Sequence, residues 1–156
     1  MSSATKYGST KERENDMLAD RLHRERKANK KPFSVFVVDD DETFLYALSF
    51  HLKKDTHWRV FCYTTAEACL DHLDLEPGAI ILDYFFSAGA AKGLDGMAAL
   101  KLILEQKPGI PVIMLSAQKD LNVSLELLKT GAFTYIVKDR EALTAIEKAL
   151  LAIRPK

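Results

Sequence analysis

Near the middle of the chain stands the stretch Gly78-Ala79-Ile80-Ile81-Leu82-Asp83. Its apolar run is too short for a helix and lacks the alternation of a half-buried strand, so it predicts a central strand buried on both faces. The run ends abruptly in a carboxylate. Asp83 is therefore expected at the rim of a sheet.

Three more apolar runs end in a residue able to bind phosphate or a metal ion. They are Phe33–Val38 followed by Asp39-Asp40-Asp41, Val112–Leu115 followed by Ser116, and Phe133–Val137 followed by Lys138. The carboxyl ends of parallel strands share one edge of a sheet, where open α/β proteins bind their ligands. We therefore expect these polar residues to converge although they are far apart in the sequence.

Helical periodicity separates the strands and completes an α/β pattern. Helices are predicted at about 43–54, from 64 to before Pro77, and at 96–106, 119–130 and 140–153, with a weaker strand at 58–63. Five strands alternating with five helices, joined by right-handed crossovers, give a doubly wound parallel sheet. The strongest apolar runs belong in its middle, so the predicted strand order is 2-1-3-4-5.

Apolar spacing assigns faces to these helices. The positions predicted to point inward are Leu45, Leu48 and Leu52 in the first helix and Leu121, Leu125 and Leu128 in the fourth, with Val123 and Leu127 off that stripe. Tyr46 and Phe50 form a second stripe, either a docking site or the flank of the core. Asp139 is the expected N-cap of the last helix.

Composition indicates one ordinary globular domain, since 47% of the 156 residues are hydrophobic and 28% are charged. No long apolar span or signal peptide is apparent, so the expected compartment is the cytoplasm. Cys62 and Cys69 match no metal spacing and are expected to be buried, reduced thiols. Residues 1–31 carry nine Lys/Arg and five Asp/Glu, which predicts a basic tail, disordered or a frayed helix, before a domain at 32–156.

The polar residues at the strand ends suit phosphoryl transfer to a carboxylate. Asp39, Asp40 and Asp83 would repel one another in one cleft unless a cation intervened, and carboxylate oxygens suit Mg²⁺. Lys138 adds a positive charge and Ser116 a hydroxyl donor, so an incoming phosphoryl group would be neutralised and held.

Four segments resemble the receiver domain of two-component response regulators. They are Val37–Asp41, Ile81–Asp83, Ile110–Ala117 and Gly131–Lys138, and the resemblance covers roughly residues 33 to 154. It implies a flavodoxin-like (βα)5 fold. It also implies that Asp83 accepts a phosphoryl group from a histidine kinase or a phosphotransfer protein, without enzymatic turnover.

The same resemblance implies roles for the surrounding residues. Asp40, Asp83 and the backbone carbonyl of Phe85 would ligate Mg²⁺, and Asp39 would hold a metal-bound water. Ser116 and Lys138 would bind the phosphoryl oxygens. Tyr135 would be the aromatic residue whose rotamer reports the phosphorylation state.

Three features depart from the family pattern. Asp139 stands where a proline usually follows the lysine, so a trans Lys138–Asp139 bond and a reshaped loop are expected. The path from Asp83 to Asp95 is longer than usual, and residues 87–93 are either a mobile lid or a tolerated surface excursion. Phe85 replaces an often polar residue beside the water path, which predicts slow hydrolysis of the acyl phosphate.

Two other functions are compatible with these motifs. Asp39-Asp40-Asp41-Glu42-Thr43 also reads as the opening motif of haloacid-dehalogenase-type phosphatases, with Asp39 as nucleophile, although a further acidic motif should then follow Lys138. A pseudo-receiver would keep the fold as a binding module without being phosphorylated.

The expected mode of action is that of a stand-alone receiver working through contacts. The face formed by the helix at 119–130, the strand at 133–137 and the helix at 140–153 is either an output or homodimer surface or ordinary packing. No nucleic acid or membrane partner is expected, and the downstream protein is not identified by the sequence.

Overall fold

The computed structural model describes residues 17, 32–86 and 93–155. The chain divides into two units, residues 1–31 and residues 32–156. Met17 is the one described residue of the first unit and is exposed. The expected tail and the longer loop after Asp83 otherwise lie outside the described residues.

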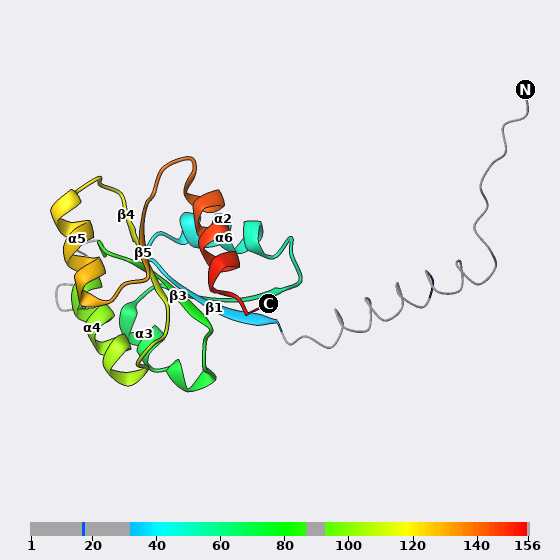
Figure 1. Cartoon of the computed structure of the whole chain (residues 1–156), viewed down its shortest axis with the longest axis horizontal. Helices are drawn as coiled ribbons and strands as arrows, with labels where there is room; N and C mark the ends of the chain where they lie inside the picture. Colours follow the sequence, from blue (N-terminus) through cyan, green and yellow to red (C-terminus); the bar gives the residue numbers. More distant parts are fainter. Residues whose placement is uncertain (1–16, 18–31, 87–92, 156) are drawn as a thin grey trace, which may run out of the picture. The chain divides into compact units, whose positions relative to one another are not determined.

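The second unit is built on a five-stranded parallel sheet (Figure 1). Its strands are β1 (Phe33–Val38), β2 (Trp58–Tyr63), β3 (Ala79–Asp83), β4 (Val112–Ser116) and β5 (Thr134–Val137). They lie in the order β2-β1-β3-β4-β5, with every neighbouring pair parallel. The predicted order is therefore confirmed.

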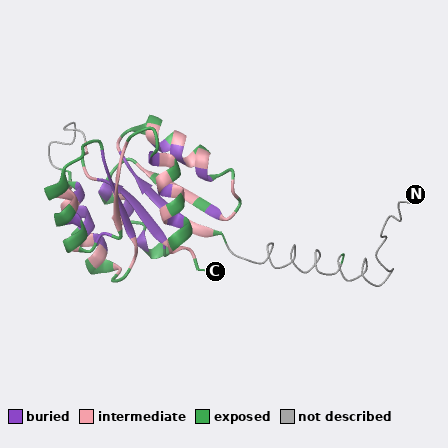
Figure 2. Ribbon diagram, turned by 45° about the horizontal axis from the view of Figure 1, so that its top comes forward, coloured by how far each residue is buried: buried purple, intermediate pink, exposed green. Residues whose placement is uncertain are grey.

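Helices follow the strands in alternation. They are α2 (Glu42–Leu52), α3 (Ala66–Leu70) with the 3₁₀ turn η1 (Leu73–Leu75), α4 (Gly96–Gln106), α5 (Leu121–Thr130) and α6 (Ala142–Ile153). Two apolar clusters cover the two faces of the sheet. One contains residues of α3, α4 and α5, and the other residues of α2 and α6. The central strands are buried between them (Figure 2), so this is the flavodoxin-like doubly wound fold.

The face of α2 agrees with the prediction from its sequence. Leu45, Leu48 and Leu52 are buried. Tyr46 and Phe50 are 74% and 59% exposed, with their rings stacked 6.4 Å apart. This aromatic pair therefore lies on the surface and not at the flank of the core.

The predicted face of α5 is wrong. Leu127 is fully buried and Val123 packs against the core, whereas Leu121, Leu125 and Leu128 are 73%, 45% and 42% exposed. The helix has two apolar faces. Only the face with Val123 and Leu127 packs on the core. Apolar spacing alone does not choose between such faces.

Two smaller expectations are also corrected. The N-cap of α6 is Glu141 rather than Asp139, whose side chain instead accepts the Glu141 N–H across a turn. Cys69 is buried, but Cys62 is exposed because it occupies an outward position on the edge strand β2. None of the helices in the described part is long and apolar enough to cross a membrane.

Candidate functional site

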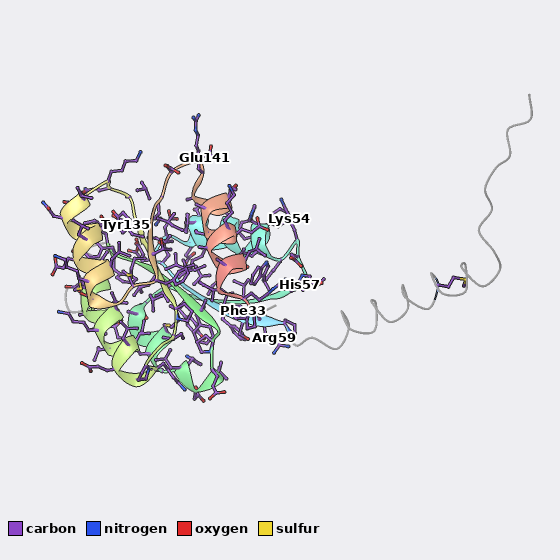
Figure 3. The ribbon with its side chains drawn as sticks, viewed as in Figure 1. Phe33, Lys54, His57, Arg59, Tyr135 and Glu141 are labelled. Carbon is purple, nitrogen blue, oxygen red and sulfur yellow. The ribbon has the colours of Figure 1, made fainter. Side chains whose placement is uncertain are left out.

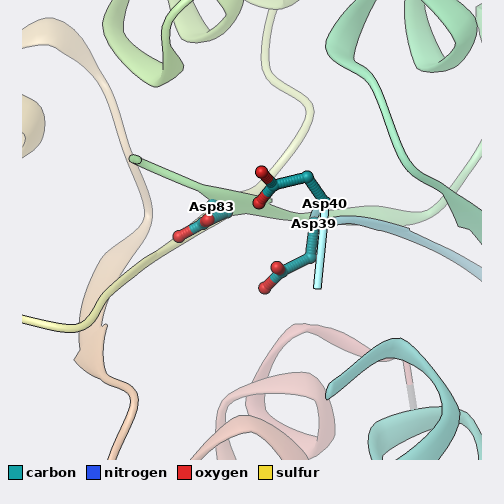
Figure 4. A group of neighbouring side chains, drawn as sticks. All are labelled: Asp39, Asp40 and Asp83. Atoms are coloured by element: carbon teal, nitrogen blue, oxygen red, sulfur yellow. The ribbon is translucent and has the colours of Figure 1, made fainter. Parts of the chain in front are cut away.

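Three carboxylates lie together at the carboxyl edge of the sheet (Figure 4). Asp39 and Asp40 follow β1, and Asp83 is the last residue of β3, the strand beside it. One oxygen from each of the three lies within 4.8 Å of the others. Asp39 and Asp83 are buried and Asp40 is half-buried. Strand order thus brings together residues that are distant in sequence.

Local hydrogen bonds fix the direction of the Asp39-Asp40-Asp41 segment. The Asp39 N–H donates to the carbonyl of Tyr63, and Asp39 Oδ1 accepts the Asp41 N–H at 2.9 Å. Asp41 is the N-cap of α2 and accepts the N–H groups of Thr43 and Phe44. Asp41 therefore caps α2, and Asp39 and Asp40 lie beside Asp83.

Lys138 enters the same site from the end of β5. Its Nζ lies 2.6 Å from Asp39 Oδ2 and 3.9 Å from Asp83 Oδ2. Its backbone N–H donates to the carbonyl of Ser116. No cis peptide bond occurs in the described ranges, so the trans Lys138–Asp139 bond is confirmed. The ammonium pairs with Asp39 and remains near Asp83.

Ser116 and Tyr135 meet through Gln118. Ser116 ends β4 and is buried, and its Oγ accepts the Gln118 N–H at 3.2 Å. The hydroxyl of Tyr135, on β5, donates to the carbonyl of the same residue. Tyr135 is half-buried beside α5 (Figure 3). The loop after β4 is thus bonded to both residues.

Burial and mutual repulsion raise the proton affinity of the carboxylates. Burial first, and then the charge of Asp39, raises the pKa of Asp83 to about 7, although Lys138 and a backbone hydrogen bond from Phe85 act to lower it. Burial also raises the pKa of Asp39, partly offset by its hydrogen bond to Lys138. Among the described residues, the ammonium of Lys138 alone does not compensate the negative charge of the three carboxylates.

These features fit a divalent cation. The donors are hard carboxylate oxygens, they converge on one point, and their charge is undercompensated, which is the environment that Mg²⁺ prefers. Asp39, Asp40 and Asp83 are the described residues that could hold the ion.

Residues 94–96 are held by two contacts that the sequence did not reveal. Glu67 Oε1, on α3, accepts the Leu94 N–H at 2.8 Å. Gly96 packs so tightly that a Cβ there would lie 2.5 Å from Tyr84 Cα and 2.7 Å from the Asp83 carbonyl oxygen. Residues 94–96 are therefore anchored beside Asp83. Phe85 is 49% exposed.

Comparison with known protein families matches residues 35–150 to the response regulator receiver domain. The transcriptional regulator NtrC of Proteus hauseri is 32% identical over 126 residues, which cover 78% of this chain and 25% of NtrC. The response regulator TmoT of Ectopseudomonas mendocina is 32% identical, over 78% of this chain and 54% of TmoT. The chain thus spans about a quarter to a half of the length of these relatives.

Solved structures show the same fold. The response regulator domain of Thermotoga maritima CheB has a TM-score of 0.67 at 24% identity, covering 81% of this chain and 99% of that one. Borrelia burgdorferi CheY, in a complex with CheX, beryllofluoride and magnesium, has a TM-score of 0.69 at 22% identity, covering 80% and 91%. The chain belongs to the response regulator receiver domain family, a signalling module of two-component systems.

Proposed function

We propose that the unit at 32–156 is a phosphoacceptor that acts in the cytoplasm, with Asp83 receiving a phosphoryl group from a histidine kinase or a phosphotransfer protein. The observation that carries the proposal is the convergence of the Asp39, Asp40 and Asp83 oxygens within 4.8 Å, with Lys138 beside them. Phosphorylation at such a site would be the chemical event that switches the signalling module between its two states. We assign it no enzymatic turnover.

In this mechanism Asp83 is the nucleophile. Its ionised oxygen forms a bond to phosphorus as the bond between phosphorus and the donor histidine nitrogen breaks, and the nitrogen keeps that electron pair. Asp40, Asp83 and the Phe85 carbonyl would hold Mg²⁺, with Asp39 on a metal-bound water, and the ion would supply positive charge to the carboxylates and the phosphoryl oxygens. Lys138 and the Ser116 hydroxyl bind the phosphoryl oxygens from two further sides.

The signal would leave the site through the loop after β4. When the Ser116 hydroxyl turns to the phosphoryl group, the geometry around Gln118 changes, and with it the partner of Tyr135. The neighbouring face formed by α5, β5 and α6 includes α5, whose Leu121, Leu125 and Leu128 are exposed. We assign this face to a downstream protein or to a second copy of the chain.

The test is labelling with a small phosphodonor in the presence of Mg²⁺. The receiver mechanism predicts that Asp83→Asn abolishes the acid-stable, base-labile label. A phosphatase of the haloacid-dehalogenase type would instead lose its label in Asp39→Asn. A beryllofluoride titration with Mg²⁺ addresses the pseudo-receiver: no binding to the wild-type protein would overturn the proposal.

A further inference from the structure

The ring of Phe44 lies against the ammonium of Lys138. Nζ of Lys138 is 4.5 Å from the ring centroid, within the range of a cation–π interaction. Phe44 is in the first turn of α2, where its N–H donates to the capping carboxylate of Asp41, and its side chain packs on the cluster under α2 and α6. The helix cap therefore fixes the backbone of Phe44, and the core packing holds its ring, both without a contribution from Lys138.

The surroundings of the ammonium leave one side open towards Asp83. An ammonium has three N–H donors. One is directed to Asp39 at 2.6 Å, and the ring of Phe44 covers another side, whereas Asp83 Oδ2 at 3.9 Å is too far for a hydrogen bond. A phosphoryl oxygen on Asp83 would extend towards Lys138 and shorten this gap.

We propose that Phe44 is a positioning residue that holds the Lys138 ammonium between Asp39 and Asp83, ready for a phosphoryl oxygen. The inference rests on the proposed function of Asp83. Lysine has a flexible four-carbon stem and loses rotamer freedom when its head is fixed. A ring that orders the side chain in advance removes part of that loss from the binding step.

The alternative is that Phe44 has only a packing role at the start of α2. Fluorination separates the two, because successive fluorines on the ring weaken its attraction for cations while its shape changes little. We would replace Phe44 by 4-fluoro-, 3,5-difluoro- and 3,4,5-trifluorophenylalanine in the full chain. The readouts are the affinity for beryllofluoride with Mg²⁺, followed by NMR, and the rate of labelling by acetyl phosphate.

The proposal predicts a graded loss, reaching roughly three- to tenfold in affinity for the trifluoro ring. Two controls belong to the experiment. The same series in a Lys138→Gln background should be flat, because the ammonium that the ring contacts is gone. Fluorination of Phe50, whose ring lies 5.3 Å from Lys54 Nζ on the exposed side of α2, should leave beryllofluoride affinity unchanged.

The outcomes distinguish this inference from the proposed function. A wild-type protein that binds no beryllofluoride overturns both. If the wild type binds it and is labelled on Asp83, a flat series at Phe44 overturns only the role of the ring. Equal slopes with and without Lys138 would also overturn it, by showing a steric effect. A graded loss that requires Lys138 supports it.

Discussion

The hydroxyl of Tyr135 donates a hydrogen bond to the backbone carbonyl of Gln118, 17 residues earlier in the chain. The N–H of Gln118 donates in turn to Ser116 Oγ. The side chains of Ser116 on β4 and Tyr135 on the neighbouring strand β5 thus form hydrogen bonds with the N–H and the carbonyl of Gln118. Gln118 therefore joins the end of β4, near the proposed phosphoacceptor site, to β5 beside α5.

We expect Ser116→Ala and Tyr135→Phe to be coupled. Each variant removes one hydrogen bond to Gln118, with an expected loss of about 1 kcal/mol in the free energy of unfolding. Because the bonds share a residue, the double variant should depart from additivity by about 0.5 kcal/mol or more in urea unfolding. Ser116→Ala combined with Tyr63→Phe, on the far edge strand β2, is the matched additive control. Additivity in both cycles would contradict the link.

The raised pKa of Asp83 predicts a pH-dependent stability in the absence of a divalent cation. The folded pKa is about 7, above the 3.8 of an ordinary aspartate, so the stability contributed by the protonated form is complete below pH 3.8. It is lost as the pH rises to and through about 7, because the unfolded chain releases this proton near pH 3.8 whereas the folded protein, with its carboxyl buried, holds it up to about pH 7. Chemical unfolding at pH values between about 5 and 8 measures this slope.

Asp83→Asn should reduce that slope, leaving the part contributed by Asp39, and stabilise the cation-free protein at about pH 8 by on the order of 2 kcal/mol. Added Mg²⁺ should raise the unfolding temperature of the wild type and change that of the variant much less. Glu42→Gln, an exposed carboxylate that follows the acidic segment, is the charge-matched control. A stability that does not depend on pH in the wild type would refute the raised pKa.

Gly96 predicts a steric limit on the segment after Asp83. A methyl group at this position would meet backbone atoms of Tyr84 and Asp83 at 2.5 and 2.7 Å, which cannot rotate away. Gly96→Ala should therefore lower the free energy of unfolding by about 2 kcal/mol or more. Gly109, with φ +83° and no atom within 4 Å of the place that a methyl group would take, is the comparison; its alanine variant should cost about 1 kcal/mol. Equal losses would contradict the steric argument.

Phe85 predicts a slow loss of the acyl phosphate. Phe85 is 49% exposed, and its ring packs edge-to-face on Tyr84, which follows the proposed phosphoacceptor Asp83. If Asp83 is the phosphoacceptor, an apolar ring there would limit the approach of water to the acyl phosphate. Phe85→Asn should speed dephosphorylation severalfold in a single-turnover decay, whereas Phe85→Leu should stay slow. An asparagine variant that decays no faster would exclude this role.

The strands and the acidic edge were predictable because their signals are local. A run such as Ala79–Leu82 identifies a buried strand by itself, and topology then places Asp39 and Asp83 together. The contacts of Phe44 with Lys138 and of Glu67 with Leu94 have no such signal. They depend on side-chain directions that follow only from the assembled fold.

The error in predicting which face of α5 is buried has a different cause, and this cause can be tested by mutation. Leu125 and Leu127 are two residues apart and so point to different sides of the helix, one exposed and the other buried. Periodicity favoured Leu125 as a core residue because Leu121 and Leu128 line up with it. In the structure the cluster beneath α5 accepts Leu127, beside Val123.

Leu127→Ala should therefore destabilise the protein by about 2 to 5 kcal/mol, the usual loss for a fully buried leucine. Leu125→Ala, the same substitution on the 45% exposed side chain, should cost less than about 1 kcal/mol. Urea unfolding of the two variants compares them directly. The reverse order would restore the face predicted from the sequence, and it would remove the exposed leucines on which the proposed output surface depends.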